Sequence, residues 1–183
     1  AGSTPFPYAA RSRSEPVATL ADATVTYATA QCDMAANRDY WDDDKQIYTT
    51  GFNPGHAAEN TAVVGRVTTD DGSLRLLLVN YACHPTTLAW DNTLLSPDFV
   101  GALREVVEHE QNAPCCFYQA PCGDLGPKAG FVGDTAVADR NGNQVGHAPL
   151  SALYSLGPPP THSPYPRPAV SAAPIAHPTT SAQ

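Results

Sequence analysis

The stretch NTAVVGRVTTDDGSLRLLLVNYACH, residues 60–84, decides the fold. Aliphatic and β-branched residues dominate 62–68, a DDG turn follows, and a second apolar run covers 74–82. Two such runs joined by a short turn that contains glycine are typical of a β-hairpin. The second run is apolar almost throughout, which is typical of a strand buried on both faces. We therefore expect the hairpin to lie inside a layered structure.

Further strands are predicted on both sides of this hairpin. Residues 21–27 (ADATVTY) alternate between apolar and polar positions, as a half-buried strand does. Residues 115–120 (CCFYQA) form a short run that we interpret as another buried strand, followed by a loop rich in Gly and Pro.

Two helices are predicted in the same region. DFVGALREVVEHE, residues 98–110, carries one apolar stripe at helical spacing. Ser96 is the expected cap of this helix, and Pro97 suits its first turn. Residues 139–153 have a helical character that internal glycines and Pro149 weaken. The order of elements predicts an α/β fold with mixed β-sheet layers and flanking helices.

Composition divides the chain into three parts. Residues 1–16 are rich in Ser, Pro and Arg and read as a loose segment. Residues 17–148 hold the apolar periodicity and every acidic residue except Glu15. Residues 149–183 hold nine of the 18 prolines and no Asp or Glu, so we expect a disordered tail. Such an abrupt change also fits a truncated or frame-shifted reading frame, and we expect residues 17–148 to be an incomplete domain.

Charge and hydropathy exclude several classes of partner. The net charge is −8 and no basic cluster occurs, which argues against nucleic acid or an anionic membrane surface as the main partner. No apolar run approaches the roughly 20 residues that a membrane span needs. The five cysteines lack CxxC spacing and are expected to be free thiols. Among them, Cys122 as a nucleophile with His84 as its base is a remote alternative, because nothing marks the thiol as activated.

His84, in NYACHPTTL (80–88), is the strongest candidate for chemistry. It stands where an apolar strand enters a loop, the usual place for ligands in α/β sheets. We expect Asn80, Thr86 and Thr87 to orient its imidazole through the second ring nitrogen. A neutral imidazole suits Zn²⁺ well. The alternative is a core histidine that is hydrogen-bonded to a carbonyl.

Two further segments carry candidate residues. In QAPCGDLGPKAGF (119–131), closely spaced glycines let a backbone approach a ligand, and Asp124 offers a carboxylate. The alternative for Asp124 is a turn in which it caps its own backbone. In AANRDYWDDD (35–44), Arg38 is suited to a substrate carbonyl or phosphate, the alternative being a structural ion pair with Asp39, Asp42 or Asp43.

Taken in order, these segments resemble the N-terminal catalytic domain of the neutral ceramidase family, the neutral/alkaline, non-lysosomal ceramidases. NRD (37–39), NYACHPTTL (80–88), SPDFVGALREVVE (96–108) and QAPCGDLGP (119–127) fall in the order of the family's motifs. The resemblance runs from about residue 35 to 110 and again over 119–127.

The resemblance implies a zinc-dependent amide hydrolase, in which a metal-activated water cleaves a C–N bond of a small-molecule or lipid amide. By position, His84 matches a zinc-ligating His, Arg38 matches a substrate-contacting Arg, and Asp124 matches the Asp of a GD loop with a catalytic role.

This sequence also departs from the family pattern. Gly126 stands where the family has a Ser implicated in activity, and the upstream segment that supplies another zinc-binding His has no counterpart. A catalytic zinc usually has three protein ligands, and this chain offers one. We therefore expect a fragment that is inactive by itself, or alternatively a non-catalytic α/β binding module derived from the same fold.

Overall fold

The computed structural model describes residues 22–90 and 92–158. The expectations for residues 1–16 and for the tail beyond residue 158 concern residues outside these ranges. The elements, in chain order, are β1 (Ala23–Gln31), β2 (Ala35–Asn37), β3 (Asp39–Asp42), β4 (Ile47–Thr50), β5 (Thr61–Thr69), β6 (Leu74–Tyr81), α1 (Phe99–Gln111), β7 (Cys115–Gln119), β8 (Leu125–Pro127) and α2 (Thr135–Ser155).

The predicted hairpin forms the centre of the main sheet. β5 and β6 pair antiparallel, with Val64 opposite Val79, and the sheet order is β1-β5-β6-β7. β1 joins antiparallel to β5, and β7 joins parallel to β6 after the crossover through α1. The β-strands predicted at 21–27 and 115–120 are therefore confirmed, with boundaries moved by up to four residues. The expectation that the second of them is buried is wrong, because only Cys115 of β7 is buried.

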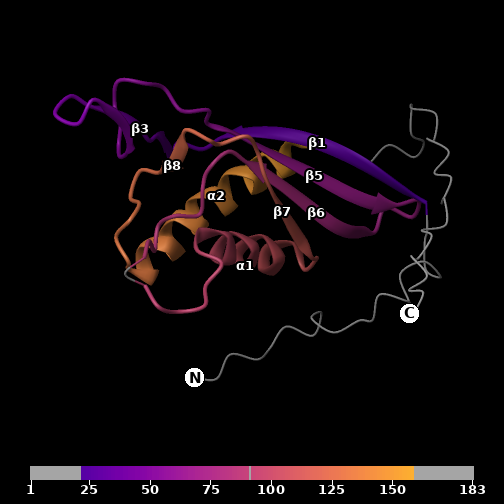
Figure 1. The fold of residues 1–183 in the computed structure, drawn as a ribbon. Coiled ribbons are helices and arrows are strands. Elements are labelled where there is room, and N and C mark those ends of the chain that lie inside the picture. The colour runs from indigo at the N-terminus through magenta and orange to yellow at the C-terminus, as the bar shows by residue number, and fades with distance from the viewer. Residues whose placement is uncertain (1–21, 91, 159–183) are drawn as a thin grey trace, which may run out of the picture.

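Both helices lie on the same side of this sheet (Figure 1). α1 and α2 pack against each other, α2 also contacts β1 and β5, and α1 contacts β7. The core between the layers holds large, fully buried side chains: Leu77, Val79, Phe99, Leu103 and Val145. The predicted α/β class with flanking helices is confirmed. Within the described residues, neither helix is long and apolar enough to cross a membrane.

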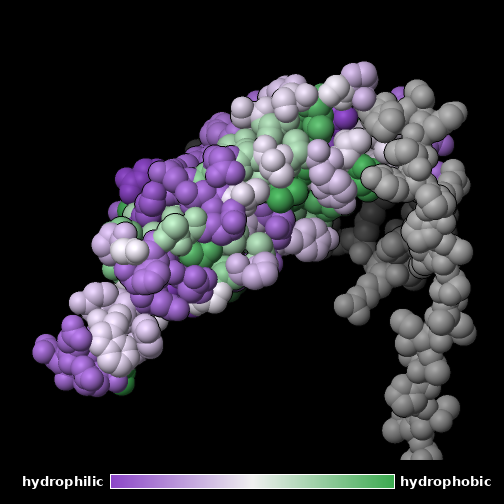
Figure 2. All heavy atoms as spheres, turned by 90° about the horizontal axis from the view of Figure 1, so that it is seen from above, coloured by the Kyte–Doolittle hydropathy of each residue, from purple (hydrophilic) through white to green (hydrophobic). Residues whose placement is uncertain are grey.

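Among residues 22–90 and 92–158 no element covers the opposite face of the sheet, and the expectation that the second hairpin strand is buried on both faces is wrong. Burial alternates along β6, with Leu77 and Val79 fully buried and Leu76 and Leu78 partly exposed. Figure 2 shows hydrophobic residues gathered over the sheet, while the projecting end that carries β3 and β4 is mostly hydrophilic. An apolar run thus predicts a strand here but not what covers each of its faces.

The N-terminus of α1 also differs from the prediction. Asp98, rather than Ser96, is the N-cap, and its carboxylate accepts from the Phe99 amide at 2.7 Å. The other carboxylate oxygen accepts from the Leu88 amide at 2.9 Å. Asp98 therefore ties the loop that follows His84 to the helix, which the Ser96 and Pro97 pattern did not reveal.

α2 extends past the expected end of the domain at residue 148. The helix contains Pro149 and continues to Ser155, with Leu150 and Leu153 buried. Packing of these two side chains into the core offsets the backbone hydrogen bond that proline cannot make. The structured part of the chain therefore reaches beyond the predicted boundary at Pro149.

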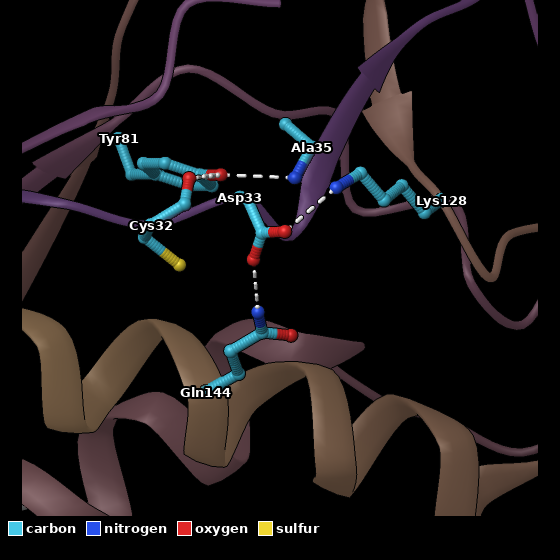
Figure 3. Close-up of polar contacts among 6 residues, drawn as sticks. All are labelled: Cys32, Asp33, Ala35, Tyr81, Lys128 and Gln144. Atoms are coloured by element: carbon cyan, nitrogen blue, oxygen red, sulfur yellow. Dashed lines mark hydrogen bonds and ion pairs between the residues drawn. The ribbon is translucent and has the colours of Figure 1, made fainter. Parts of the chain in front are cut away.

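The two short sheets, β2–β8 and β3–β4, escaped prediction because three- and four-residue strands carry little periodicity. The turn before β2 is anchored to the remaining layers (Figure 3). There the Tyr81 hydroxyl donates to the Cys32 carbonyl and accepts from the Ala35 amide, at 2.8 and 2.9 Å. The carboxylate of Asp33 accepts from Lys128 beyond β8 at 2.9 Å and from Gln144 of α2 at 2.8 Å. The β2–β8 pair is consequently held in place from three directions.

Candidate functional site

The three predicted site residues meet at one place. Arg38 follows β2, His84 lies three residues beyond the end of β6, and Asp124 directly precedes β8. Antiparallel pairing of β2 with β8 sets Ala36 opposite Gly126 and so brings the first and third segments together. The His84 amide donates to the Leu125 carbonyl at 3.2 Å, and this hydrogen bond joins the second segment, which contains His84, to the other two.

The imidazole of His84 is oriented by backbone carbonyls. Nδ1 lies 2.8 Å from the Cys122 carbonyl and 3.2 Å from that of Leu125, so Nδ1 carries the proton and Nε2 presents its lone pair. The expectation that Asn80, Thr86 and Thr87 orient the ring is wrong. The Asn80 amide, for example, donates to the Tyr118 carbonyl at 2.8 Å instead. The resulting tautomer is the one that leaves Nε2 able to bind a metal or accept a proton.

The guanidinium of Arg38 lies against both other segments. Its Nε and Nη2 donate to the Gly123 carbonyl at 3.2 and 2.9 Å. Nη2 also lies 3.5 Å from Nε2 of His84. Arg38 is not held by an ion pair with the acidic residues 39–44. Its guanidinium donates to the Gly123 carbonyl instead, and Asp42 pairs with Lys45 at 2.9 Å.

Asp124 is positioned by a residue that sequence reasoning missed. Asn37 is 7% exposed, and its Nδ2 donates to Oδ2 of Asp124 at 3.0 Å. The Asn37 Oδ1 accepts from the Asp39 amide at 3.1 Å, so both ends of the side chain are used. The Asp124 carbonyl accepts from the Arg38 amide at 2.8 Å. The signal available in the sequence was an Asn directly before a candidate Arg, and nothing in the sequence marked this Asn as buried.

Gly126 and Thr86 both lie beside Arg38. A Cβ built on Gly126 would lie 3.4 Å from Cδ of Arg38 and 3.7 Å from Oγ1 of Thr86, both ordinary van der Waals contacts. The Thr86 hydroxyl is buried and has no hydrogen-bond partner among the described residues. An unpaired buried hydroxyl usually costs stability. Asn60 Oδ1 and Thr68 Oγ1 are also buried without a partner among the described residues.

A zinc ion does not fit the residues that this chain brings together. His84 offers one neutral imidazole, but within residues 22–90 and 92–158 no three His, Cys, Asp or Glu side chains form a group that could hold a metal. Cys122 does not help, because its carbonyl and not its thiol meets the imidazole, and its buried thiol accepts from Gln119 at 2.8 Å. Among the described residues, His84 is therefore not joined by further side chains that could complete a metal site.

Comparison with solved structures identifies proteins of similar fold. A ceramidase complexed with C2 superposes with a TM-score of 0.59 at 19% identity, over 75% of this chain and 23% of that one. Neutral ceramidase from Pseudomonas aeruginosa superposes with a TM-score of 0.54 at 20% identity, over 76% of this chain and 23% of that one. No family model and no curated protein sequence matches the chain. The chain therefore has a ceramidase-like fold and spans about a quarter of the length of these two structures.

Proposed function

We propose that this chain supplies part of the active site of an amide hydrolase related to neutral ceramidase. The observation that carries the proposal is the convergence of Arg38, His84 and the Gly123–Asp124 loop, which lie about 40 residues apart along the sequence, on a ceramidase-like fold. A small-molecule or lipid amide is the proposed substrate class, since both similar structures are ceramidases.

Each of the three residues has a proposed role that follows from its surroundings. His84 presents the lone pair of Nε2 and is the one proposed zinc ligand of this chain, the remaining ligands being supplied from outside it. The guanidinium of Arg38 faces the same space and is suited to a substrate oxygen. Asp124, held by Asn37 and exposed on its other side, is proposed to take up or give a proton during amide cleavage.

Amide hydrolysis and metal content test this proposal together. Release of fatty acid from a short-chain ceramide should occur in a longer protein that contains these residues, and His84→Ala should abolish both activity and bound zinc. His109→Ala is the matched control, because His109 lies on α1 with its side chain 86% exposed. The isolated 183-residue chain should hold far less than one zinc per molecule. Full activity of His84→Ala would contradict the assignment.

A non-catalytic binding module is the second candidate function. It is favoured by the absence of a three-ligand group among the described residues and by Gly126, which offers no hydroxyl at the position where the resembling family has one. Amide binding without hydrolysis, in a longer protein as well as in this chain, would support this function over the first.

A further inference from the structure

Two neighbouring loops expose large apolar side chains beside the candidate site. The loop between β6 and α1 contributes Trp90, Leu94 and Leu95, all of them exposed, with Trp90 at 80%. The loop between β8 and α2 contributes Phe131 and Val132, which are also exposed. We call these five residues the apolar patch. Exposed apolar residues that gather in one place, unlike those scattered singly, usually mark a surface that meets a protein or a membrane.

A ring contact and hydrogen bonds join the two loops, which run side by side near the start of α2 (Figure 1). The ring centroids of Trp90 and Phe131 lie 5.8 Å apart. Nδ2 of Asn92 donates to the Gly133 carbonyl at 3.1 Å, and Oδ1 of the same side chain accepts from the Leu94 amide at 2.8 Å. The two loops therefore form one surface, and hydrogen bonds hold the backbone that presents it.

The backbone of the apolar patch is strained where it presents its aromatic rings. Phe131 has a φ of 54°, in the left-handed region that a bulky residue rarely adopts. Ala89, directly before Trp90, has a φ of 53°. Both rings are exposed, so the strain does not serve to bury them in the core. Strained backbone of this kind gathers at ligand contacts, which supports a contact role for the two rings.

The apolar patch adjoins the residues that we propose to act on an amide. The Phe131 amide donates to the Thr86 carbonyl at 2.9 Å, and Thr86 follows His84 by two residues. A Cβ on Gly126 would lie 3.7 Å from Oγ1 of Thr86 and 3.4 Å from Cδ of Arg38. A lipid amide in a bilayer keeps its polar amide at the level of the headgroups and its chains in the hydrocarbon. A bilayer that meets the patch would therefore present the amide on the side of the candidate site.

Charge near the apolar patch favours zwitterionic over anionic lipid. Residues 76–103 and 129–139 contain no Lys or Arg, the side chains that anionic headgroups attract. Asp91 and Asp134 stand next to the patch in the sequence, and the net charge of the chain is −8. Leu, Phe and Trp, by contrast, are the side chains that insert at the boundary between headgroups and acyl chains. The patch therefore suits a bilayer that it enters by apolar insertion.

We propose that the apolar patch docks this chain on a zwitterionic lipid bilayer, with Trp90, Leu95 and Phe131 inserted at the level of the headgroups and upper acyl chains. The proposal deepens the proposed function by stating where a lipid amide is met, and it rests on that function for the choice of a lipid as the partner. A second copy of the chain seated on the patch is the other outcome that the test must separate.

Tryptophan fluorescence on phosphatidylcholine vesicles tests the docking with the 183-residue chain itself. The chain has two Trp residues, so Trp41→Phe leaves Trp90 as the single reporter. The emission of Trp90 should shift to shorter wavelength on vesicles, and brominated phosphatidylcholine should quench it, because the indole enters the bilayer. Trp90→Phe is the matched control. The remaining Trp41 donates to Asp43 at 2.9 Å on the hydrophilic end that carries β3 and β4, and its emission should show neither change.

Leu95→Glu locates the contact. Leu95 is fully exposed, so the variant should fold, and loss of its insertion should weaken partitioning onto the vesicles at least about tenfold. Ile47→Glu, at an exposed position on β4, adds the same charge outside the apolar patch and should leave partitioning unchanged. Undiminished partitioning of Leu95→Glu contradicts the docking, and so does the absence of vesicle binding by the unsubstituted chain.

Sedimentation and amide hydrolysis separate the remaining outcomes. Self-association that Leu95→Glu abolishes, without vesicle binding, would overturn the docking and make the apolar patch a contact between copies of the chain. Vesicle binding by the chain, with no hydrolysis of a short-chain ceramide by a longer protein, would overturn the proposed function and leave the docking. Hydrolysis that depends on His84, without vesicle binding, would overturn the docking and leave the proposed function.

Discussion

Thr86 and Thr87 are neighbours whose hydroxyl groups are in opposite situations. Oγ1 of Thr87 is buried and accepts from Nδ2 of Asn141 at 3.1 Å, which fastens the loop after His84 to α2. Oγ1 of Thr86 is buried without a partner among the described residues. The first hydroxyl should stabilise the fold, and the second should not.

Valine substitutions measure this difference because they keep the shape and remove the hydroxyl. We expect Thr87→Val to lower the free energy of unfolding by about 1–3 kcal/mol, since it leaves an Asn141 N–H unpaired. Thr86→Val should leave stability unchanged or raise it by up to about 1 kcal/mol. Urea unfolding followed by circular dichroism checks both values. Equal losses in the two variants would show that Thr86 has a partner after all, such as a buried water.

At the scale of single residues, the sequence predicted three candidate side chains that the structure brings together, but not what they contact. His84, Arg38 and Asp124 were recognisable from strand-end position, charge and neighbouring glycines. Their partners are mostly backbone carbonyls, of Gly123, Cys122 and Leu125, and every residue has a carbonyl. Such contacts depend on the path of the chain and leave no signature in residue type.

At the scale of elements, the contact between α1 and α2 depends on a glycine. A Cβ on Gly142 would lie 2.3 Å from the Phe99 carbonyl and 2.7 Å from Cβ of Ala102, so the two helices approach closely at this point. A Cβ on Gly146, one turn further along α2, would lie 3.2 Å from the nearest atoms of Leu103 and Val106. The sequence suggested that these glycines weaken the helix, whereas the structure shows why packing requires the first of them.

Alanine substitutions at the two glycines should therefore give a graded result. Gly142→Ala must push the helices apart, and we expect it to destabilise the protein by about 1–3 kcal/mol or more, despite the gain in helix propensity. Gly146→Ala should be milder, because a shift of a few tenths of an ångström relieves it. Thermal unfolding of both variants checks the order, and a stability of Gly142→Ala equal to that of the unsubstituted protein would contradict the close approach.

The turn between β5 and β6 contains a pH-sensitive carboxylate. Oδ1 of Asp71 accepts from the Thr69 hydroxyl at 2.6 Å and from the Ser73 amide at 2.9 Å. These hydrogen bonds lower the pKa of Asp71 to about 2. Because this pKa lies below the value of about 3.9 in an unfolded chain, the stabilisation is fully present above about pH 4 and disappears as the pH falls through about 2.

Asp71→Asn tests this pH dependence. The unsubstituted chain should be more stable than the variant at pH 6, and the difference in unfolding free energy should shrink toward zero near pH 2. Asp70→Asn, at the neighbouring carboxylate of the same turn, controls for the change in net charge. A difference that stays constant between pH 6 and pH 2 would exclude the charged form of Asp71 as its cause.

At the scale of the whole molecule, the sequence predicted the α/β class but not which faces of the sheet the helices cover. The hairpin, the helical stripe and the strand at 115–120 predicted an α/β fold with mixed β-sheet layers and flanking helices, and the structure adds that β7 pairs parallel to β6. Periodicity could not show that both helices lie on one face of the sheet, because the sequence of an apolar strand is the same whether one or both of its faces are covered. The chain spans about a quarter of the length of the two similar ceramidase structures.

The two-layer packing makes a direct prediction about the thiols. All five cysteines are free, and Cys116 alone is exposed, on the open face of β7, while Cys32, Cys83, Cys115 and Cys122 are buried. Burial raises the pKa of the Cys115 thiol to about 12, and it raises the pKa values of Cys83 and Cys32 as well. Since the thiolate is the reactive form, burial suppresses these thiols both sterically and by protonation.

Ellman's reagent at pH 8 should therefore modify one thiol per folded chain quickly and all five after denaturation. Cys116→Ser should remove the fast reaction and leave the circular dichroism spectrum unchanged, because the side chain is exposed on β7, the last strand of the described sheet. Rapid reaction of two or more thiols in the folded chain would mean that the helices do not cover the sheet as described. Such a result would be most informative at Cys115, whose thiol points into the layer that α1 closes.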